Sequence, residues 1–445
     1  MASSPIAVMP RDREVLRLAL PALGALIAEP LYVLGDTAIV GHLGTTQLAG
    51  LALAGLLLGE VLSFCTFLEY GTTSKVARLF GADQQAEALR VGVQATWLAL
   101  ALGLVLVVVI ELAAGPALTA MGGGETAARD QGLEWIRVAA LGAPFVLLTA
   151  AAQGWMRGFQ DTRTPLIVLA GANVVSIALS AFLVFGLDLG IRGSAIANVA
   201  AQSAGGLLLL WMLLRRRPPS LRPDWSVIRP QLRMARDLLV RTGAFFVAFT
   251  VAAAVAARMG DPQLGAHQVG MQLWIFCALF LDATAIAAQA LIGKLLGAGA
   301  PEVAAALARR LLIAGIGLGC AFAVLLGAGH DIIPRLFTSD RDVLAQAAVL
   351  WPFLAGMMPL NGLLFALDGV LFGAGDMRFM RNVTVVAALG GYLPATLLTL
   401  QFDLGLRGLW TGLSLFIVVR LAGGMARWRG RRWLVGGVRT VDEVT

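Results

Sequence analysis

Charged residues are scarce in this sequence. Only 14% of its 445 residues are Asp, Glu, Lys or Arg, whereas 58% are hydrophobic, and the mean hydropathy is +0.80. An average soluble domain carries about 25% charged residues. The scarcity of charge therefore argues against a soluble protein.

Cysteine and histidine are also rare. The three cysteines, Cys65, Cys277 and Cys320, lie far apart in apolar segments, so we expect buried free thiols and no disulfide framework. The three histidines are scattered without the spacing of metal ligands. We also find no clustered nucleophile or soluble catalytic domain, and we therefore expect neither an enzyme nor a bound cofactor.

Long apolar segments dominate instead. Runs of about 20 residues, the length that crosses a hydrocarbon core of about 30 Å, recur along the whole chain. The short alternating strands of a β-barrel are absent from the pattern. We therefore predict an all-α polytopic membrane protein with twelve transmembrane helices near residues 15–40, 46–70, 89–113, 131–156, 165–187, 192–214, 237–258, 264–292, 305–329, 346–372, 382–402 and 406–425.

The basic residues predict the orientation of these helices. With the N-terminus inside, most of the 34 basic residues fall in segments on the cytoplasmic side. Clusters such as RRRPPSLR at 215–222 flank helices, so anionic lipid headgroups explain the net charge of +7 better than nucleic acid does. Lysine is nearly absent and alanine abundant, which favours a high-GC bacterial genome. We expect the bacterial inner membrane, with both termini cytoplasmic.

The sequence contains an internal repeat. DLGIRG at 188–193 recurs as DLGLRG at 403–408, and GFQDTR at 158–163 recurs as GAGDMR at 373–378. We predict an N-terminal lobe at 1–214, a basic linker at 215–236 and a C-terminal lobe at 237–445. An even number of helices in each copy gives a parallel, pseudo-two-fold repeat of two six-helix bundles. Two such bundles favour a transporter that works by alternating access.

Several acids lie inside the predicted helices, where an acid costs roughly 2.5–3.5 kcal/mol and usually faces a cavity or a partner. The candidates for an ion or substrate site are Glu29, Asp36, Asp282 and Asp368. A structural hydrogen bond to a neighbouring helix is the alternative for each of them. Glu69 lies near a helix end, and we expect it to reach the lipid headgroups.

The repeat separates scaffold residues from candidates for coupling. Asp36 aligns with Val251 or Ala252, and Asp368 aligns with Gln153. An acid that is present in one half only is not required by the repeated fold. We therefore expect proton coupling at Asp36, which would be protonated from outside and release its proton inside while a cationic substrate competes for it.

Two further patterns accompany these acids. Glu29 and Asp36 lie seven residues apart, so they share one helix face, and Asn361 and Asp368 repeat that spacing. Pro21 and Pro30 interrupt the backbone hydrogen bonds of the first helix and allow it to bend.

The sequence resembles the multidrug and toxic compound extrusion (MATE) family, and its DinF-like branch in particular. The stretches that carry the resemblance are GDTAIVGHLGTTQLAG at 35–50, GTTSKVARLFGAD at 71–83, RGFQDTRTP at 157–165, FLDATAIAAQALIGKLLGAG at 280–299 and LDGVLFGAGDMRFMR at 367–381. The family implies efflux of organic cations and other amphipaths, driven by H⁺ or Na⁺. The resemblance implies that Asp36 is the proton-coupling acid of the N-terminal lobe, Pro21 a bending point, Asp368 the acid of sodium-driven members and Gln153 a polar cavity residue.

The sequence also departs from the family pattern. In the fifth helix Asn173 remains, but Ser176 and Ser180 replace an Asn and an Asp of some relatives. Ala253 replaces the seventh-helix acid of sodium-driven members. The loss of one Na⁺ ligand favours H⁺ as the coupling ion, although Asp282 and Asp368 could form a second site.

Alternative functions fit the sequence to different degrees. A major-facilitator transporter is disfavoured because its Asp-Arg-Gly-Arg signature is missing. A lipid-linked-precursor flippase of the same superfamily stays open, as does a sodium-coupled exporter, whereas a membrane enzyme or receptor fits poorly. The partners that we expect are small amphipathic molecules and membrane lipids, and we expect a monomer.

Overall fold

The computed structural model describes residues 9–123 and 126–444, and it contains helices but no strand within those ranges. Eleven of the described helices are long and apolar enough to cross a membrane, and a bent pair of helices gives a twelfth span. The predicted all-α polytopic class is therefore confirmed.

Contacts divide the chain into two compact units, Leu20–Ala235 and Met1–Ala19 with Arg236–Thr445. The helices up to the middle of the chain are α1 (Asp12–Gly41), α2 (Thr45–Ser63), α3 (Phe67–Gly81), α4 (Gln85–Leu118), α5 (Ala127–Ala140), α6 (Ala143–Gly158), α7 (Arg163–Ala181) and α8 (Gly190–Arg215). The later helices are α9 (Trp225–Met259), α10 (Asp261–Gly297), α11 (Pro301–Ala328), α12 (Arg341–Ala374), α13 (Met377–Val385), α14 (Leu393–Gln401), α15 (Gly405–Arg429) and α16 (Val441–Val444). Short 3₁₀ or π segments complete the list: η1 (Phe64–Thr66), η2 (Thr119–Gly123), η3 (Phe182–Gly186), η4 (Pro334–Leu336) and η5 (Val386–Tyr392).

Helix boundaries differ from the predictions in several places. The span predicted at 46–70 runs from Thr45 to Gly81 through α2, η1 and α3. The helix predicted at 131–156 is the pair α5 and α6, which meet at an angle of 53°. Pro144 lies in the first turn of α6 and has no N–H to continue α5. In addition, α9 begins at Trp225, so the second half of the segment 215–236 is helical.

The sequence repeat reappears in the backbone. Asp188 and Asp403, which occupy the same place in the two DLG turns, have φ of 53° and 49°. Gln160 has φ of 64°, and its counterpart Gly375 has φ of 71°. Few residues adopt this left-handed conformation without a local reason. The two halves therefore turn the chain in the same way at equivalent loops.

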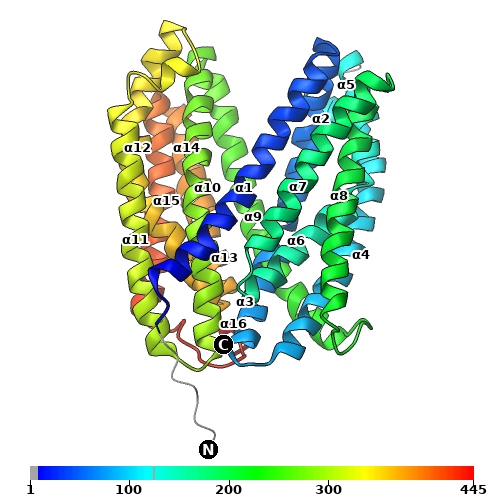
Figure 1. Cartoon of the computed structure of the whole chain (residues 1–445). Coiled ribbons are helices and arrows are strands. Elements are labelled where there is room, and N and C mark those ends of the chain that lie inside the picture. The colour runs from blue at the N-terminus through cyan, green and yellow to red at the C-terminus, as the bar shows by residue number, and fades with distance from the viewer. Residues whose placement is uncertain (1–8, 124–125, 445) are drawn as a thin grey trace, which may run out of the picture. The chain divides into compact units, whose positions relative to one another are not determined.

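Helices approach closely through glycines inside each unit. In the C-terminal unit, where α12 packs against both α10 and α11 (Figure 1), a Cβ at Gly362 would lie 2.0 Å from the Gly315 carbonyl oxygen. In the other unit, a Cβ at Gly50 would lie 2.7 Å from the Gly132 nitrogen. Small residues allow the two backbones to touch. This close packing holds the helices together, because apolar lipid gives them no hydrophobic driving force to associate.

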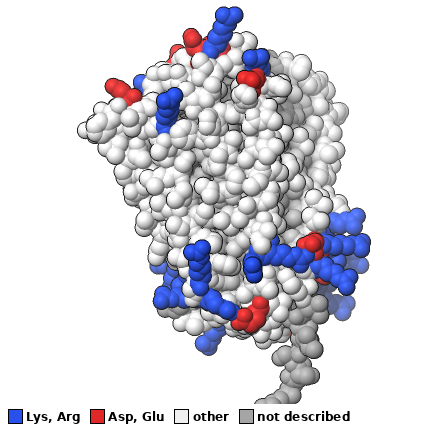
Figure 2. Space-filling model, turned by 90° about the vertical axis from the view of Figure 1, so that its left-hand side faces the viewer, with Lys and Arg blue, Asp and Glu red and all other residues white. Residues whose placement is uncertain are grey.

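The surface is apolar between charged ends. On the face drawn in Figure 2, Lys, Arg, Asp and Glu gather toward two ends, and an uncharged belt lies between them. Ile313 and Val324 of α11 are exposed, as expected for side chains that face lipid. Cys65 and Cys277 are buried as predicted, but the prediction was wrong for Cys320, which is exposed on α11.

The segment after α15 folds back along its own unit. Trp433 is buried, and the Gly437 N–H donates to the Leu296 carbonyl at 2.8 Å. Asp442 accepts the backbone N–H groups of Met377 and Arg378 at 2.9 and 3.0 Å, at the start of α13. The C-terminal segment thus closes one helix end by a side-chain cap.

This cap predicts a pH-dependent docking of the C-terminal segment. Burial raises the pKa of Asp442 from 3.8 to about 6, and the charge of Asp376 adds to the effect, whereas the backbone hydrogen bonds oppose it. Docking is therefore strongest below pH 4 and weakens as the pH rises through about 6. Hydrogen exchange, corrected for the intrinsic rate, should show less protection of this segment at pH 8 than at pH 5.

Asp442→Asn should remove that pH dependence, because the amide stays neutral. Asp331→Asn, at an exposed site, serves as the control and should behave as the wild type. Equal protection of the wild-type segment at both pH values would contradict the prediction.

Candidate functional site

Asp36 is buried among hydroxyl groups of the N-terminal half. Its side chain is only 4% exposed. Ser194 of α8 lies 2.8 and 2.7 Å from the two carboxyl oxygens, and Ser180 of α7 donates to Oδ1 at 3.0 Å. Among the described residues, no Lys, Arg or His forms an ion pair with Asp36. The carboxyl group is therefore held by neutral donors.

The contacts of Asp36 continue into a wider polar group. Trp135 of α5 donates its indole N–H to the Ser194 hydroxyl at 3.1 Å. One turn before Asp36 on α1, Tyr32 accepts a hydrogen bond from Asn198 of α8 at 2.5 Å. Four helices, α1, α5, α7 and α8, thus position the site.

Sequence reasoning missed Ser194, Trp135, Tyr32 and Asn198, although the repeat held a signal for most of them. At the same offset of 215 residues, Ser194 aligns with Leu409, and Asn198 aligns with Leu413. The comparison of the two halves was applied only to acids. Applied to every polar residue, it would have selected these positions as well.

The other N-terminal candidates lie on or near α7. Asn173 donates to the Ala28 carbonyl of α1 at 3.0 Å, and Ser176, one turn further along α7, is 2% exposed. Glu29 shares α1 with Asp36, but its side chain is exposed. The structure therefore brings Ser180 to Asp36 and does not bury Glu29 beside it.

The helix-bending prolines lie within one continuous helix. Pro21 and Pro30 are both inside α1, which runs from Asp12 to Gly41. Each of them removes one backbone N–H from that helix.

Gln153 belongs to a separate ion-paired group. It accepts a hydrogen bond from Arg157 at 2.9 Å, and Arg157 also forms an ion pair with Glu69. Both charged side chains are largely buried. The prediction that Glu69 reaches the headgroups was therefore wrong, because its partner lies inside the unit.

Asp368 is held by two arginines, in what we call the Asp368 cluster: Asp368 of α12, Arg241 of α9 and Arg420 of α15. Arg241 and Arg420 both reach Asp368 Oδ2, at 3.2 and 2.5 Å. The three side chains are 13%, 14% and 6% exposed, in the order of that definition. A carboxylate with two guanidinium partners differs from the free carboxylate that a cation needs.

The remaining C-terminal candidates lie apart in the described contacts. Asn361 of α12 is 1% exposed, and neither polar atom of its amide has a partner among the described residues. Asp282 of α10 is partly buried. No hydrogen bond or ion pair of the Asp368 cluster includes either residue.

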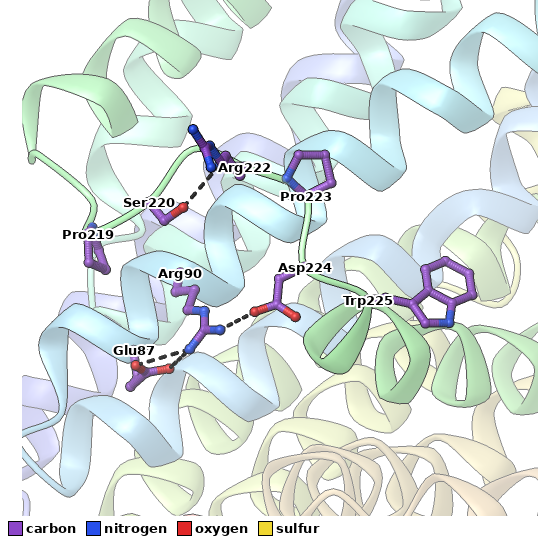
Figure 3. Close-up of a pocket in the computed structure, with 8 residues that line it drawn as sticks. All are labelled: Glu87, Arg90, Pro219, Ser220, Arg222, Pro223, Asp224 and Trp225. Carbon is purple, nitrogen blue, oxygen red and sulfur yellow. Dashed lines mark hydrogen bonds and ion pairs between the residues drawn. The ribbon is translucent and has the colours of Figure 1, made fainter.

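The segment between α8 and α9, residues 216–224, is bound to α4, and we call it the strap. Asp224 pairs with Arg90, Gln94 bonds both the Arg222 carbonyl and the Asp224 N–H, and Trp97 donates to the Leu221 carbonyl. Figure 3 shows the pocket beside this strap, which has a volume of about 380 Å³ and is lined by Glu87, Arg90, Pro219, Ser220, Arg222, Pro223, Asp224 and Trp225.

The strap ends where α9 begins. The Asp224 side chain accepts the N–H and hydroxyl of Ser226, and these bonds, with the Arg90 pair, hold the pKa of Asp224 below its ordinary value. The contacts fix the start of α9 to the N-terminal unit. They are partly exposed contacts, and we assign the pocket no ligand.

Comparison with known proteins identifies the relatives of this chain. The MatE family model matches residues 21–182 and 240–397. Protein DETOXIFICATION 44, chloroplastic, of Arabidopsis thaliana is 32% identical, over 94% of this chain and 81% of the relative. DNA damage-inducible protein F of Escherichia coli (strain K12) is 33% identical, over 96% and 93%. A crystal structure of a MATE protein in the bent conformation superposes with a TM-score of 0.87 at 20% identity, over 95% of this chain and 96% of that one.

The hydroxyl of Ser194 predicts a stability effect. Ser194→Ala should lower the free energy of unfolding by about 1–3 kcal/mol, because the buried Trp135 N–H loses its acceptor and the Asp36 carboxyl group loses a donor. Thermal unfolding of the detergent-solubilised protein measures the change. Ser63→Ala is the control, since the Ser63 hydroxyl bonds only to Glu60, in its own helix turn. If both variants melt alike, the Ser194 hydroxyl has no special role in stability.

Proposed function

The chain belongs to the MatE family of multidrug and toxic compound extrusion transporters, and from this premise we propose that it exports amphipathic, mostly cationic organic compounds in exchange for H⁺. The exchange would proceed by alternating access, with Asp36 carrying the proton. The observation that supports this role is the burial of Asp36 among neutral hydroxyl donors.

The surroundings of Asp36 suit a group that gains and loses a proton. Removal from water favours the neutral carboxyl form, whereas hydrogen bonds from Ser180 and Ser194 favour the charged form. Among the described residues, no arginine or lysine pairs with Asp36, in contrast to Asp368. With opposing influences of this kind, both the protonated and the ionised carboxyl group are accessible, which a proton carrier requires.

The proposed cycle couples this proton to the substrate by competition. Protonated Asp36 has no charge to attract a cation, so proton uptake from outside would release the bound substrate. Loss of the proton to the inside would restore the carboxylate, which then favours a new cationic substrate. Because the substrate and the proton do not occupy the site together, the transporter exchanges one for the other.

One feature supports H⁺ over Na⁺. Na⁺ requires several oxygen ligands. The carboxylate of Asp368, the other candidate for a cation site, is already paired with two arginines. Asp36 brings one carboxylate and two serine hydroxyls. These hydroxyls are the observation that keeps the sodium-coupled alternative open, so the coupling ion is the first object of the test.

The proposal extends to the setting of the protein. We propose that the protein works in a bacterial inner membrane with both termini cytoplasmic, because most Lys and Arg lie in segments on one side of the predicted helices. Figure 2 shows more of them at its lower end. The proposed exchange uses small amphipathic molecules and ions as its partners and requires neither a cofactor nor a second subunit.

Vesicle transport tests the role of Asp36. Purified protein in lipid vesicles should move ethidium when a pH gradient is the only driving force, and a Na⁺ gradient alone should not drive it. Asp36→Asn should reduce the pH-driven rate to that of empty vesicles, because the amide cannot carry the proton.

Asp188→Asn is the matched control for this charge change. Asp188 lies in a turn with φ of 53°, a conformation that Asn tolerates, and its variant should transport normally. Full-rate transport by Asp36→Asn would sink the proposal. Export driven by Na⁺ alone would support the sodium-coupled alternative, and lipid scrambling without ethidium movement would support a flippase.

A further inference from the structure

The Asp368 cluster carries more positive than negative charge. Arg241 and Arg420 share a single acid, and both bind the same oxygen of it. The neighbouring acids have their own partners: Asp237 pairs with Arg236 and Arg381, and Asp376 pairs with Arg427. One guanidinium charge in the cluster therefore has no counter-charge among the described ion pairs.

Both arginines also keep unused donors. The Nε atoms of Arg241 and Arg420 are buried and have no hydrogen-bond partner among the described residues. The Arg420 side chain is more than nine-tenths buried, at 6% exposed. A buried charged donor without a partner is costly. The cluster thus has both the charge and the free N–H groups to hold an anion.

Aromatic rings surround the two guanidinium groups. Arg241 lies 5.0 Å from the ring centre of Phe245 and 5.1 Å from that of Phe372. Arg420 lies 5.0 Å from Phe245 and 5.4 Å from Phe416. Cation–π contacts stabilise the two charges, but they do not provide a hydrogen-bond acceptor for the Nε donors. The rings orient the arginines without neutralising them.

The aromatic group extends beyond the arginines. Phe249 contacts Phe245, Phe416, Trp274 and Tyr392, with ring centres 5.7–6.1 Å apart. The Trp274 indole N–H and the Tyr392 hydroxyl are buried without a partner among the described residues. An apolar body with few polar atoms would find complementary surroundings next to the charged cluster.

We propose that the Asp368 cluster is a binding site for an anionic oxygen-acid group, a carboxylate or a phosphate, carried by an amphipathic molecule. The planar guanidinium group suits such groups because its N–H donors match two oxygens at once. The inference rests on the proposed function only in that the bound molecule would be cargo. It adds organic anions to the substrate classes of the transporter.

The repeat places this charge in one half only. Asp368 aligns with Gln153, which lies beside the balanced pair of Arg157 and Glu69. At the offset of 215 residues, Arg420 aligns with Gly205. The fold therefore does not require the excess positive charge.

Equilibrium dialysis of radiolabelled 2-naphthoate against the protein in phosphatidylcholine nanodiscs tests the site, with empty nanodiscs as the blank. Arg420→Gln and Arg241→Gln should each weaken binding by about tenfold or more, because each removes a charged donor. Asp368→Asn should tighten binding severalfold, because it removes the competing carboxylate. Uncharged 2-naphthamide should not bind above the blank.

Arg309→Gln removes the same charge from an exposed position of α11 and should bind as the wild type. If the cluster arginine variants fail to fold, the Asp368→Asn comparison decides alone. Displacement of 2-naphthoate by phosphatidylglycerol in the nanodisc would support the site and identify its resident anion as a lipid phosphate.

Three results would overturn the proposal: no binding above the blank, binding that the cluster variants leave unchanged, or Na⁺ binding that Asp368→Asn abolishes. Dialysis uses no ion gradient, so failure of this site and failure of proton-driven ethidium export are distinguishable.

Discussion

The bilayer core offers no water to a polar group, and the other features of this structure depend on that constraint. Every backbone N–H and C=O in the core must find a partner inside the protein, which leaves helices as the form for such apolar segments. Since lipid is as apolar as leucine, helices gain little from hydrophobic contact with one another. Backbones that touch at Gly315 and Gly362 supply the packing instead.

The same constraint sorts the charged groups by their partners. Asp36 has hydroxyl donors and, among the described residues, no basic partner, which is why we propose it as the proton carrier. Asp368 lies between two arginines, so a negative charge is fixed there and a positive one is left over. Glu69 and Arg157 balance each other. Acids that look alike in the sequence thus have three different environments, and we assign the proposed proton exchange to the first.

The sequence predicted the helices and the repeat because hydropathy and turn chemistry are local. The turns at Asp188 and Asp403 could be recognised from six-residue stretches. The partners of Asp36 could not, because Ser180 and Ser194 lie 144 and 158 residues away from it in the chain. The environment of Asp368 could not be predicted for the same reason: its partners Arg241 and Arg420 lie 127 and 52 residues away from it in the chain.

The repeated fold can hold the two proposed sites, one in each half. The turns and the loop aspartates are shared by both halves, since each half must fold in the same membrane. Residues that differ between the halves are free of that requirement. The N-terminal half has a carboxyl group among hydroxyls where the other half is apolar, and the C-terminal half has arginines where the other half has Gly205. In a chain that repeats its fold, the mismatched polar residues are therefore where function should be sought.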